Sequence, residues 1–593
     1  MKTLKYILLA VSALFISGCN TLDVENIYNY DAELVWNDEN LVNSYLADLY
    51  NRIYGEPSNT SDTNSEQMTG IYWYADRVSI TNGEGKLWDY TNIRKINDGL
   101  QEIESCTLDQ DFKDNIKGQL LFLRGYLYSK MVFRHGGVPY ITVPQDRETD
   151  DLYVSRNTTA ECFDLISKDI DEAITLLPEY IPSSSSDFGK VHGAYALAYK
   201  AGVLLWKASP VFHPGNPYGN PDWQAAYNAS KEAYDKLTGY GYGLEPEFKN
   251  IFLNEGGPET VFSVIAIYPN KTFNYLAWGA RPGSEARAQA SCGITWEYAK
   301  DFLMKDGKRW NDPSSEYYTG SDETGFAQHF WENRDDRFYA SLLWNGALYE
   351  AGGKSGNRQY TALGLCNTLD DFGTNPNASI NSTNLDRYSG IFQRKFDDLK
   401  LSQATSLQYD IDWIVLRFAE VILNYAEAAN ETGNTSEAIG LLKQIRERAG
   451  IEAGADGTYG IGIPSREQLR ELILAERNIE FGFEGKRYDD LRRLREIGRL
   501  HNSTKHGLEA IAVNPDGTET DMGEALTKCN AEELTESDFK YVIHQIPFSG
   551  VKVNEIPDVN KYAIYPIQQS VLEKNPKIEQ NSNWGGTFNP TLE

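Results

Sequence analysis

The chain has 593 residues, a formal net charge of −29 at pH 7, 41% hydrophobic residues and 24% charged residues. This composition is typical of a folded globular body and excludes a disordered or membrane-embedded chain, and the length allows one large core or two or three domains. The acidity argues against nucleic acid and anionic lipid headgroups as ligands, because both require a basic face on the protein.

The N-terminus predicts export and attachment to lipid. Two lysines precede an almost unbroken apolar run of ten residues at 7–16, and Ser-Gly-Cys follows, ending at Cys19. Such a run suits the core of a signal peptide and falls short of the roughly 20 residues that a spanning helix needs. The segment resembles a bacterial lipobox, and the alternative is an ordinary secretory signal with a cysteine near its cleavage site. We expect a signal peptide at 1–18, lipid on Cys19 and a tether at 19–39.

Between residues 40 and 244 the sequence shows the periodicity of amphipathic helices. Leu41, Tyr45, Leu49 and Ile53 recur every four residues and predict one apolar face. We expect helices at 40–54, 88–103, 115–133, 162–177, 192–209 and 223–237. The Gly-Gly-Val-Pro run at 136–139 predicts the end of the third helix and the start of an extended segment.

The middle of the chain, about 245–414, changes character. The apolar run at 259–267 predicts a strand, and long stretches rich in Gly, Asn, Ser and Asp, such as 368–384, separate the apolar runs. Loops this long are uncommon in compact domains and usually carry function.

Helical periodicity returns at Val415. The helix expected from there ends at Gly433, and Asn434 with Glu437 three residues later predicts a capping box that opens the next helix. A further pair of helices is expected over 466–495. Hairpins of roughly 34 residues with alternating small and large apolar residues look like degenerate tetratricopeptide units. Such arrays present surfaces to other proteins, and the alternative role is a rigid frame for the loops.

Nothing in the sequence predicts catalysis or a cofactor. Seven histidines are spread without a paired metal-binding spacing, and there is no nucleophile elbow and no Walker loop. Carboxylates are abundant, so residue type alone leaves a glycosidase pair open, but no two are singled out. The five cysteines other than Cys19 are far apart and show no C-x-x-C. We expect buried thiols, no disulfide framework and no metal site.

The unusual quantity is the aromatic content: 37 Tyr, 24 Phe and 12 Trp. Many of these rings must lie in the core, but others fall in loops among Gly and Asn, as at 71–77 and 274–283. Exposed rings in loops suit ligands with apolar faces and polar edges, of which sugars are the commonest.

Several segments resemble one family. The blocks at 122–141, 415–433, 472–494 and 565–584, together with the lipobox, look like those of SusD/RagB-family outer-membrane nutrient-binding lipoproteins. The most specific is the run E-R-x-x-E-F-x-x-E-G-x-R-x-x-D-L-R-R that starts at Glu476. The resemblance spans nearly the whole chain.

The resemblance implies a mainly α fold, in which tetratricopeptide-like helical hairpins frame a loop-rich insertion with a few short strands. It implies a single SusD-like domain at 40–593, with a helical frame at 40–244 and 415–593 and a ligand-side region at 245–414. Such proteins sit as a lid over a SusC-like TonB-dependent transporter in the outer membrane, facing the cell exterior. They pass oligosaccharides to it without bond chemistry. The alternative on the same fold is a peptide- or protein-binding lipoprotein for uptake or adhesion.

In such proteins the ligand surface is built from loops after the first helical elements and from the middle insertion, here 60–86 and about 270–350. The candidate stacking rings of the first loop are Tyr72, Trp73 and Tyr74, and its candidate hydroxyl readers are Asp76, Arg77 and Asn82. The candidates on the opposite wall are Trp278 and Arg281, with Trp331 and Trp344 as further rings. The alternative for each ring is packing against a helix, which we expect for Trp88 and Trp296.

The charged residues of the family blocks predict structure rather than ligand binding. They recur at helical spacings and can form an ion-pair network that bridges two helices. The residues concerned are Glu476, Arg477, Glu480, Glu484, Arg487, Asp490 and Arg492. Arg417 and Glu420 invite the same interpretation.

Overall fold

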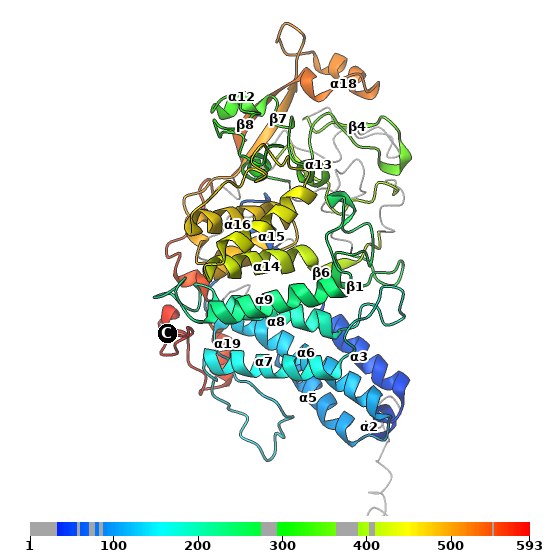
Figure 1. The fold of residues 1–593 in the computed structure, drawn as a ribbon, viewed down its shortest axis with the longest axis vertical. Coiled ribbons are helices and arrows are strands. Elements are labelled where there is room, and N and C mark those ends of the chain that lie inside the picture. The colour runs from blue at the N-terminus through cyan, green and yellow to red at the C-terminus, as the bar shows by residue number, and fades with distance from the viewer. Residues whose placement is uncertain are drawn as a thin grey trace, which may run out of the picture.

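The computed structural model describes residues 32–55, 60–69, 78–81, 87–273, 293–362, 389–401, 409–547 and 551–593. The molecule is elongated, and most of its long helices lie across the long axis in successive layers (Figure 1). The N-terminal helices occupy one end. Helix α18 (Met522–Asn530) and strands β7 (His506–Ala512) and β8 (Phe539–Gln545) occupy the other.

The first helical part runs from α2 to α9. Its helices are α2 (Ala32–Trp36), α3 (Glu39–Ile53), α4 (Thr60–Thr63), α5 (Tyr90–Ser105), α6 (Gln110–His135), α7 (Thr159–Leu176), α8 (Gly193–Ala208) and α9 (Asp222–Gly239). Along the chain, α6 packs against α7, α7 against α8 and α8 against α9. The helices predicted over this part are confirmed, and the largest shift is the earlier start of α6.

The end of α6 follows from two glycines. Gly136 adopts a φ of +73°, and a Cβ on it would lie 2.7 Å from Pro590. A Cβ on Gly137 would lie 2.1 Å from the carbonyl oxygen of Asn157. Only glycine tolerates the positive φ at 136 and the close backbone approach at 137. The predicted end of the helix is therefore confirmed, and the two glycines explain it.

The middle region is made of short elements. They are η2 (Phe248–Asn250), β1 (Thr260–Val264), α11 (Trp296–Asp301), α12 (Glu323–Ala327), α13 (Asp336–Ser341), β2 (Leu342–Leu343), β3 (Ala347–Leu348), η3 (Ala351–Gly353), β4 (Arg358–Gln359) and β5 (Phe392–Gln393). Strand β2 pairs with β5 and β3 with β4, both antiparallel. The strand predicted at 259–267 is confirmed as β1, whereas the prediction of strands and loops missed α11, α12 and α13.

The second helical part returns after the middle region. Its elements are β6 (Trp413–Arg417), α14 (Phe418–Glu431), α15 (Thr435–Arg448), α16 (Arg466–Glu480), α17 (Arg487–Arg493), η5 (Ile497–Leu500), η6 (Glu536–Asp538), η7 (Lys561–Ala563), α19 (Gln569–Lys574) and η8 (Ser582–Trp584). Helix α14 packs against both α15 and α16. The predicted hairpin over 418–448 is confirmed, and so is the mainly α fold.

The prediction of a helix from Val415 is wrong for its first three residues. Val415, Leu416 and Arg417 belong to β6, which pairs antiparallel with β1 and places Leu416 opposite Phe262. The helix begins only at Phe418. This pairing joins the middle region to the second helical part, which local periodicity could not reveal.

The predicted capping box at Asn434 is also wrong. The Asn434 side chain donates to Thr432 Oγ1 at 3.0 Å and makes no capping bond to α15. Glu437 instead accepts hydrogen bonds from the hydroxyls of Tyr227, at 2.8 Å, and Tyr425. Its carboxylate therefore ties α15 to α9 and α14.

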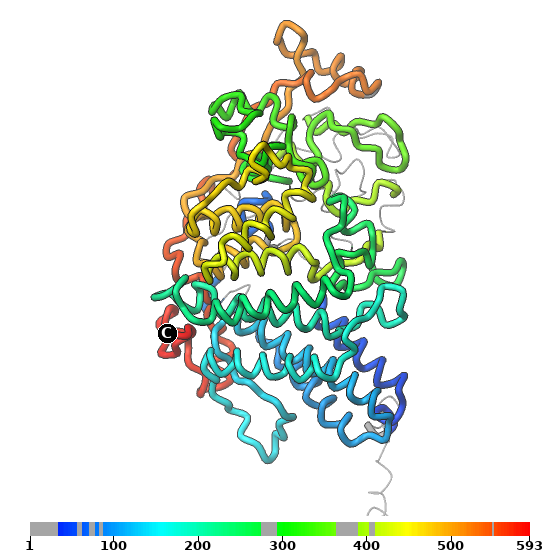
Figure 2. The backbone as a smooth tube through the Cα atoms, in the orientation of Figure 1, coloured from blue at the N-terminus to red at the C-terminus, as the bar shows by residue number. Residues whose placement is uncertain are grey.

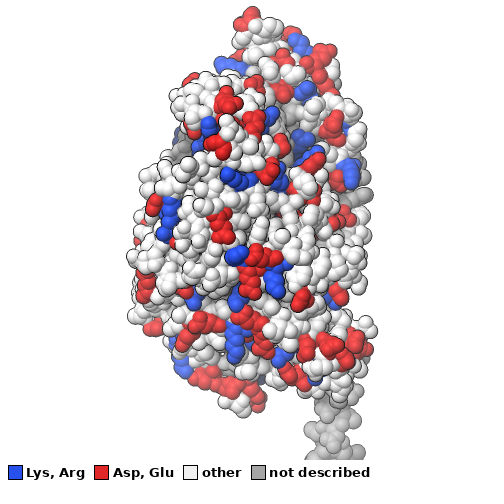
Figure 3. Space-filling model, in the orientation of Figure 1, with Lys and Arg blue, Asp and Glu red and all other residues white. Residues whose placement is uncertain are grey.

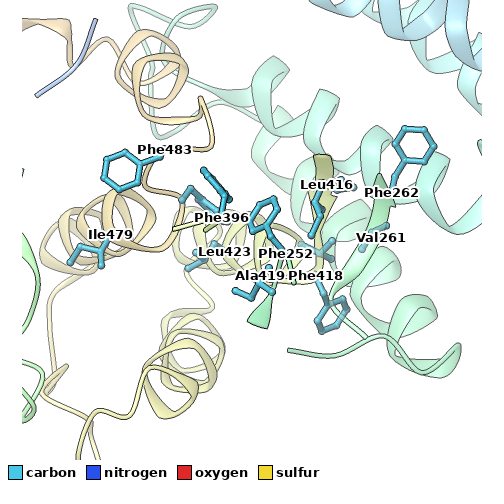
Figure 4. Close-up of a cluster of buried hydrophobic side chains, with 14 of the residues drawn as sticks. Phe252, Val261, Phe262, Phe396, Leu416, Phe418, Ala419, Leu423, Ile479 and Phe483 are labelled. Carbon is cyan, nitrogen blue, oxygen red and sulfur yellow. The ribbon is translucent and has the colours of Figure 1, made fainter. Parts of the chain in front are cut away.

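The two helical parts share a core around the β1–β6 pair (Figure 4). Phe262, Leu416 and Phe418 are all buried there. Phe252 and Phe396 meet edge to face with 4.4 Å between ring centroids. Because burying one large apolar side chain stabilises a fold by roughly 1.5–3 kcal/mol, this core is a substantial link between the two parts.

A buried ion-pair network lies beside this core, as predicted from the charged family block. Arg417 binds Glu259 at 2.6 Å, Glu480 at 2.7 Å and Glu484 at 2.9 Å. Arg337 of α13 also binds Glu480, at 3.2 Å. Further members are Asp335, Lys395, Arg446, Arg448 and Glu476. The network joins β6, α13, α15 and α16, and so extends beyond the two helices expected.

The other predicted charges form ion pairs around α17. The pairs are Arg477–Asp490, Arg492–Asp489, Lys486–Glu420 and Arg487–Glu66. Burial opposes the ionisation of Asp490, but the guanidinium groups of Arg477 and Arg493 outweigh it and lower the pKa of Asp490 to about 2. These residues act as struts.

The chain does not keep its N-terminal residues together. The segment 60–69 leaves the other N-terminal helices and lies among the later helices, close to α16 (Figure 2). Gln67 Nε2 accordingly donates to the Asn478 side chain at 2.9 Å. On the face seen in Figure 3, acidic and basic side chains are interspersed despite the net charge of −29.

Candidate functional site

Of the residues predicted to contact ligand, eight lie outside the described residues. They are Tyr72, Trp73, Tyr74, Asp76, Arg77, Asn82, Trp278 and Arg281. Cys19 lies outside them as well. The described residues next to them in the chain show which parts of the predicted ligand loops lie together.

Two of these segments meet at their bases. The backbone N–H of Thr69 donates to the carbonyl oxygen of Gly293 at 2.8 Å, and the Gly293 N–H donates to Thr69 Oγ1 at 2.8 Å. Thr69 directly precedes 70–77, and Gly293 directly follows 274–292. The two loops predicted to form opposite walls of the binding surface, 60–86 and about 270–350, are therefore bonded to each other at this point.

A third segment, 363–388, ends at the same point. The Ile294 N–H donates to the carbonyl oxygen of Ile391 at 2.9 Å. A Cβ on Gly293 would lie 1.8 Å from Ser389 Oγ, so only glycine permits this approach. The three stretches of chain that meet here, which we call the junction, are 66–69, 293–295 and 389–391.

Buried polar contacts fix the junction to the helical frame. Gln67 binds Asn478 as described above, and the nearby Asp62 carboxylate accepts from the Gly485 N–H at 3.1 Å. Burial raises the pKa of Asp62 to about 7, and the negative charge of Glu484 adds to the shift. The chain that precedes the predicted ligand residues 72–77 is thus held by the strongly charged family block.

A cleft of about 960 Å³ lies beside the junction, and we call it the α16 cleft. Leu472, Ala475 and Ile479 of α16 form its floor at helical spacing, and Glu66 of the junction lines it. Ile463, which is 97% exposed, also lines it. None of the described residues that line this cleft is aromatic.

Several charged side chains in the α16 cleft form ion pairs. Arg487 binds Glu66 and Arg309 binds Asp301, the latter at 3.0 Å. Burial opposes the ionisation of Glu66, but Arg487 outweighs it and lowers the pKa of Glu66. For Asp301 burial dominates and raises its pKa, although Arg309 opposes the shift. Sequence analysis named Arg487 as a structural charge but missed Glu66, Asp301 and Arg309, because no motif marks them.

A second pocket, of about 520 Å³, has a different lining, and we call it the Trp88 pocket. It lies between α5, α19 and the segment 139–154, and two rings line it, Trp88 and Tyr90. Trp88 is half-buried and packs only partly against the core. The expectation that Trp88 is a core residue is therefore correct only in part.

Two other predicted rings are not surface contacts. Trp331 and Trp344 are 8% and 6% exposed. Trp331 packs against Tyr541, and Trp344 packs against Phe338, with 5.3 Å and 5.2 Å between ring centroids. Their prediction as ligand contacts is wrong, because neighbouring rings cover them. Trp296 is fully buried, as expected.

Three further features of the described part of the chain concern metal ligands, thiols and membrane-spanning helices. No set of three or more His, Cys, Asp or Glu side chains there is arranged to hold a metal ion. Cys106, Cys162 and Cys529 are buried free thiols, as expected, whereas Cys292 and Cys366 lie outside the described residues. Among the described residues, no helix is both long enough and apolar enough to cross a membrane.

Known protein families match almost the whole chain. The SusD family matches residues 224–584, and a family described as starch-binding, associating with outer membrane, matches residues 20–201. The SusD-like proteins P2 and P38 of Formosa agariphila are each 24% identical to this chain. The two alignments each cover 68% of this chain, and 70% and 71% of the respective relative.

Solved structures share the fold. A SusD-like protein of Bacteroides fragilis has a TM-score of 0.70 at 23% identity, over 93% of this chain and 98% of that one. A SusD-like carbohydrate binding protein of the same species has a TM-score of 0.67 at 17% identity, over 92% and 99%. A laminarin binding SusD-like protein has a TM-score of 0.54 at 17% identity, over 92% and 99%.

Proposed function

This chain belongs to the SusD family, and we propose that it captures oligosaccharides at the outer surface of the cell. The observation that carries the proposal is the junction, where the segments with the predicted ligand residues are joined at their bases. Rings and hydroxyl readers on these two segments would share one ligand. Two structural relatives are described as binding carbohydrate or laminarin, which supports the same class of ligand.

Each stacked ring would contribute roughly 0.5–1.5 kcal/mol, by analogy with ring–ring contacts. Three such rings would contribute about 1.5–4.5 kcal/mol, which corresponds to a dissociation constant of about a millimolar or weaker. Calorimetric titration with a panel of plant, host and microbial oligosaccharides tests the proposal. We expect heat with at least one neutral or acidic glycan. Binding of peptides with no binding of any glycan would overturn it.

We further propose that the captured ligand passes to a SusC-like TonB-dependent transporter. One matching family is described as associating with the outer membrane, and lipid on Cys19 would keep the protein beside such a barrel. Affinity purification of the full chain from detergent-solubilised outer membranes tests this. We expect a β-barrel transporter to co-purify, and to be lost when Cys19→Ala releases the chain. Recovery of the chain without any barrel would contradict the partner.

The capture would involve no bond cleavage. Glu66 and Asp301 of the α16 cleft are each paired with an arginine, and no metal centre occurs in the described part of the chain. Incubating catalytic amounts of protein with each bound glycan tests this, and we expect no shorter products. Release of reducing ends above the level of a buffer control would contradict it.

The α16 cleft favours a second candidate function, the capture of peptides. An aliphatic floor without rings suits aliphatic side chains better than sugar faces. Fluorescence anisotropy with a labelled five-residue peptide of leucine and alanine tests it. We expect binding that Ala475→Arg abolishes, because the new side chain would fill the floor. Equal affinity in both proteins, or none in either, would rule this function out.

A further inference from the structure

The Trp88 pocket combines two aromatic rings with side-chain amides. The Tyr90 hydroxyl donates to the carbonyl oxygen of Pro139 at 2.6 Å, which holds the ring against the pocket wall. Trp88 lies beside it with 5.3 Å between ring centroids. The amide side chains that line the pocket are Asn97, Gln145, Gln568 and Asn575. Rings with amides are the usual means of binding sugars, since rings cover apolar faces and amides read hydroxyls.

The walls of this pocket are held in place by the same amides. Asn97 Nδ2 donates to the carbonyl oxygen of Ile141 at 2.9 Å, and Asn575 Nδ2 donates to that of Val154 at 2.9 Å. The Asn97 bond joins the segment 139–154 to α5, and the Asn575 bond joins the same segment to the C-terminal region. The pocket is therefore a built cavity and not a gap beside a free loop.

The charge of the pocket is opposite to that of the protein. Of the described residues that line it, only Arg94 and Lys574 are charged, and both are cationic, whereas the chain as a whole carries −29. Arg94 is paired with Asp98 at 2.8 Å. Lys574 makes no ion pair within the described part of the chain, so its ammonium group is available to a ligand.

Apolar side chains at the rim are exposed to solvent. Val143 and Leu152 are 63% and 46% exposed and both line the pocket. A ligand that covers them gains the free energy of removing apolar surface from water. Sugars can do this with their C–H faces while their substituents reach the amides and the cation.

We propose that the Trp88 pocket binds a sugar unit that carries a negatively charged substituent, either a carboxylate or a sulfate ester. This inference rests on the proposed capture of oligosaccharides and names a second site for them. The site is separate from the junction. It lies by α5 and α19, whereas the junction lies near α16, in another layer of the molecule (Figure 1). Lys574 would pair with the anion, and Trp88 would stack on the sugar ring.

Calorimetric titration of the full chain with three probes tests the proposal. The probes are tetragalacturonate, the same tetramer with every carboxylate methyl-esterified, and a sulfated galactan tetrasaccharide. We expect at least one anionic probe to bind ten-fold or more tightly than the neutral ester, with an affinity that falls as salt rises. Binding of tetragalacturonate assigns the carboxylate, and binding of the sulfated probe alone assigns the sulfate ester.

Variants separate this pocket from other sites. Lys574→Gln should reduce the affinity for the anionic probe about ten-fold, whereas Lys540→Gln, at the opposite end of the molecule on the exposed side of β8, should not. Val143→Asp should also weaken binding, because it adds a negative charge at an exposed rim position that tolerates substitution. Trp88→Leu should weaken the anionic and the neutral probe alike.

Three results would overturn the proposal. The first is equal affinity for tetragalacturonate, its methyl ester and the sulfated probe. The second is an affinity for the anionic probe that neither Lys574→Gln nor Val143→Asp changes. The third is binding of neutral glycans alone. The last result would leave the capture of oligosaccharides intact and reject only the acidic site. Absence of binding to every glycan would reject both proposals together.

Discussion

The two helical parts of the molecule are held together by different chemistry. Between α3 and α9 the contacts are aromatic: Tyr195 stacks on Phe262 with 4.1 Å between centroids, and Tyr54 and Tyr126 pack beside them at 4.9 Å from each other. Around α14–α16 the contacts are buried ion pairs centred on Arg417 and its neighbours. Both parts are built from packed helices, so the difference lies in the side chains that fill the space between helices.

This difference bears on what each part tolerates. Ring packing is a sum of many weak contacts, so removing one hydroxyl leaves the rest in place. A buried ion-pair network fails when one partner is lost, because the remaining charges stay buried without compensation. The junction is attached to the networked part, through Gln67 and Asp62. The junction is therefore fixed by the less tolerant half of the molecule.

The largest effect is expected from Arg417→Met. This change leaves Glu259, Glu480 and Glu484 without their shared cation, and breaking a buried pair costs about 3–5 kcal/mol. Urea denaturation followed by circular dichroism should show the free energy of unfolding reduced by that amount. A loss below about 1 kcal/mol would mean that the network does not stabilise this part.

A smaller, pH-dependent effect is expected from Asp62→Asn. The pKa of Asp62 is raised to about 7 in the folded protein, against about 3.9 in an unfolded chain. The folded state thus prefers the protonated carboxyl, and stability should fall as pH rises from about 4 to about 7. Asparagine cannot ionise, so the variant should be more stable than the wild type at pH 8, by on the order of 1–3 kcal/mol.

Denaturation curves recorded at pH 4 and pH 8 check this prediction. At pH 4 the wild type and Asp62→Asn should differ little, because Asp62 is protonated in the folded protein. If the free energies of unfolding of the wild type and of Asp62→Asn differ by the same amount at pH 4 and at pH 8, Asp62 is ionised in the folded state.

The ring-packed part should respond more weakly, as in Tyr195→Phe. The only group removed is the hydroxyl, which lies 3.2 Å from the hydroxyl of Tyr54. A hydrogen bond of this kind contributes about 1 kcal/mol, while the stack on Phe262 remains. If Tyr195→Phe lowers the free energy of unfolding as much as Arg417→Met does, the ring-packed part is no more tolerant of substitution than the ion-paired part.

The smallest effect is expected from Arg52→Met, which serves as the control for Arg417→Met. Arg52 pairs with Asp48 at 2.6 Å on the surface of α3, where both side chains are 46% exposed. Water screens such pairs, and most contribute nothing measurable. We expect an unfolding midpoint in urea that matches the wild type. A clear shift would show that surface charge matters more here than the account allows.

Local patterns predicted the helices and the charged struts well. Apolar residues at helical spacing located the long helices, and the block that starts at Glu476 identified Glu480 and Arg477 as structural. Local patterns could not predict partners that are distant in sequence. Examples are Phe262 opposite Leu416 in the β1–β6 pair and Thr69 bonded to Gly293 at the junction.

The candidate site was predictable only in part. The rings of 70–77 and 274–292 stand out because they fall among Gly and Asn, and their bases do meet. The lining of the two pockets carries no such signal, since Glu66, Asp301 and Lys574 are ordinary charged residues until the fold surrounds them. Trp331 and Trp344 show the converse error, because loop-like sequence around a ring does not prove exposure.

The central claim is that residues on both sides of the junction bind one oligosaccharide. A double-mutant cycle on Trp73→Ala and Trp278→Ala, titrated with the tightest glycan of the panel, tests it most directly. We expect each change alone to weaken binding roughly 2- to 10-fold, and the two effects to be non-additive because both rings contact the same ligand. Unchanged affinity in both single variants, with the fold intact by circular dichroism, would contradict the account.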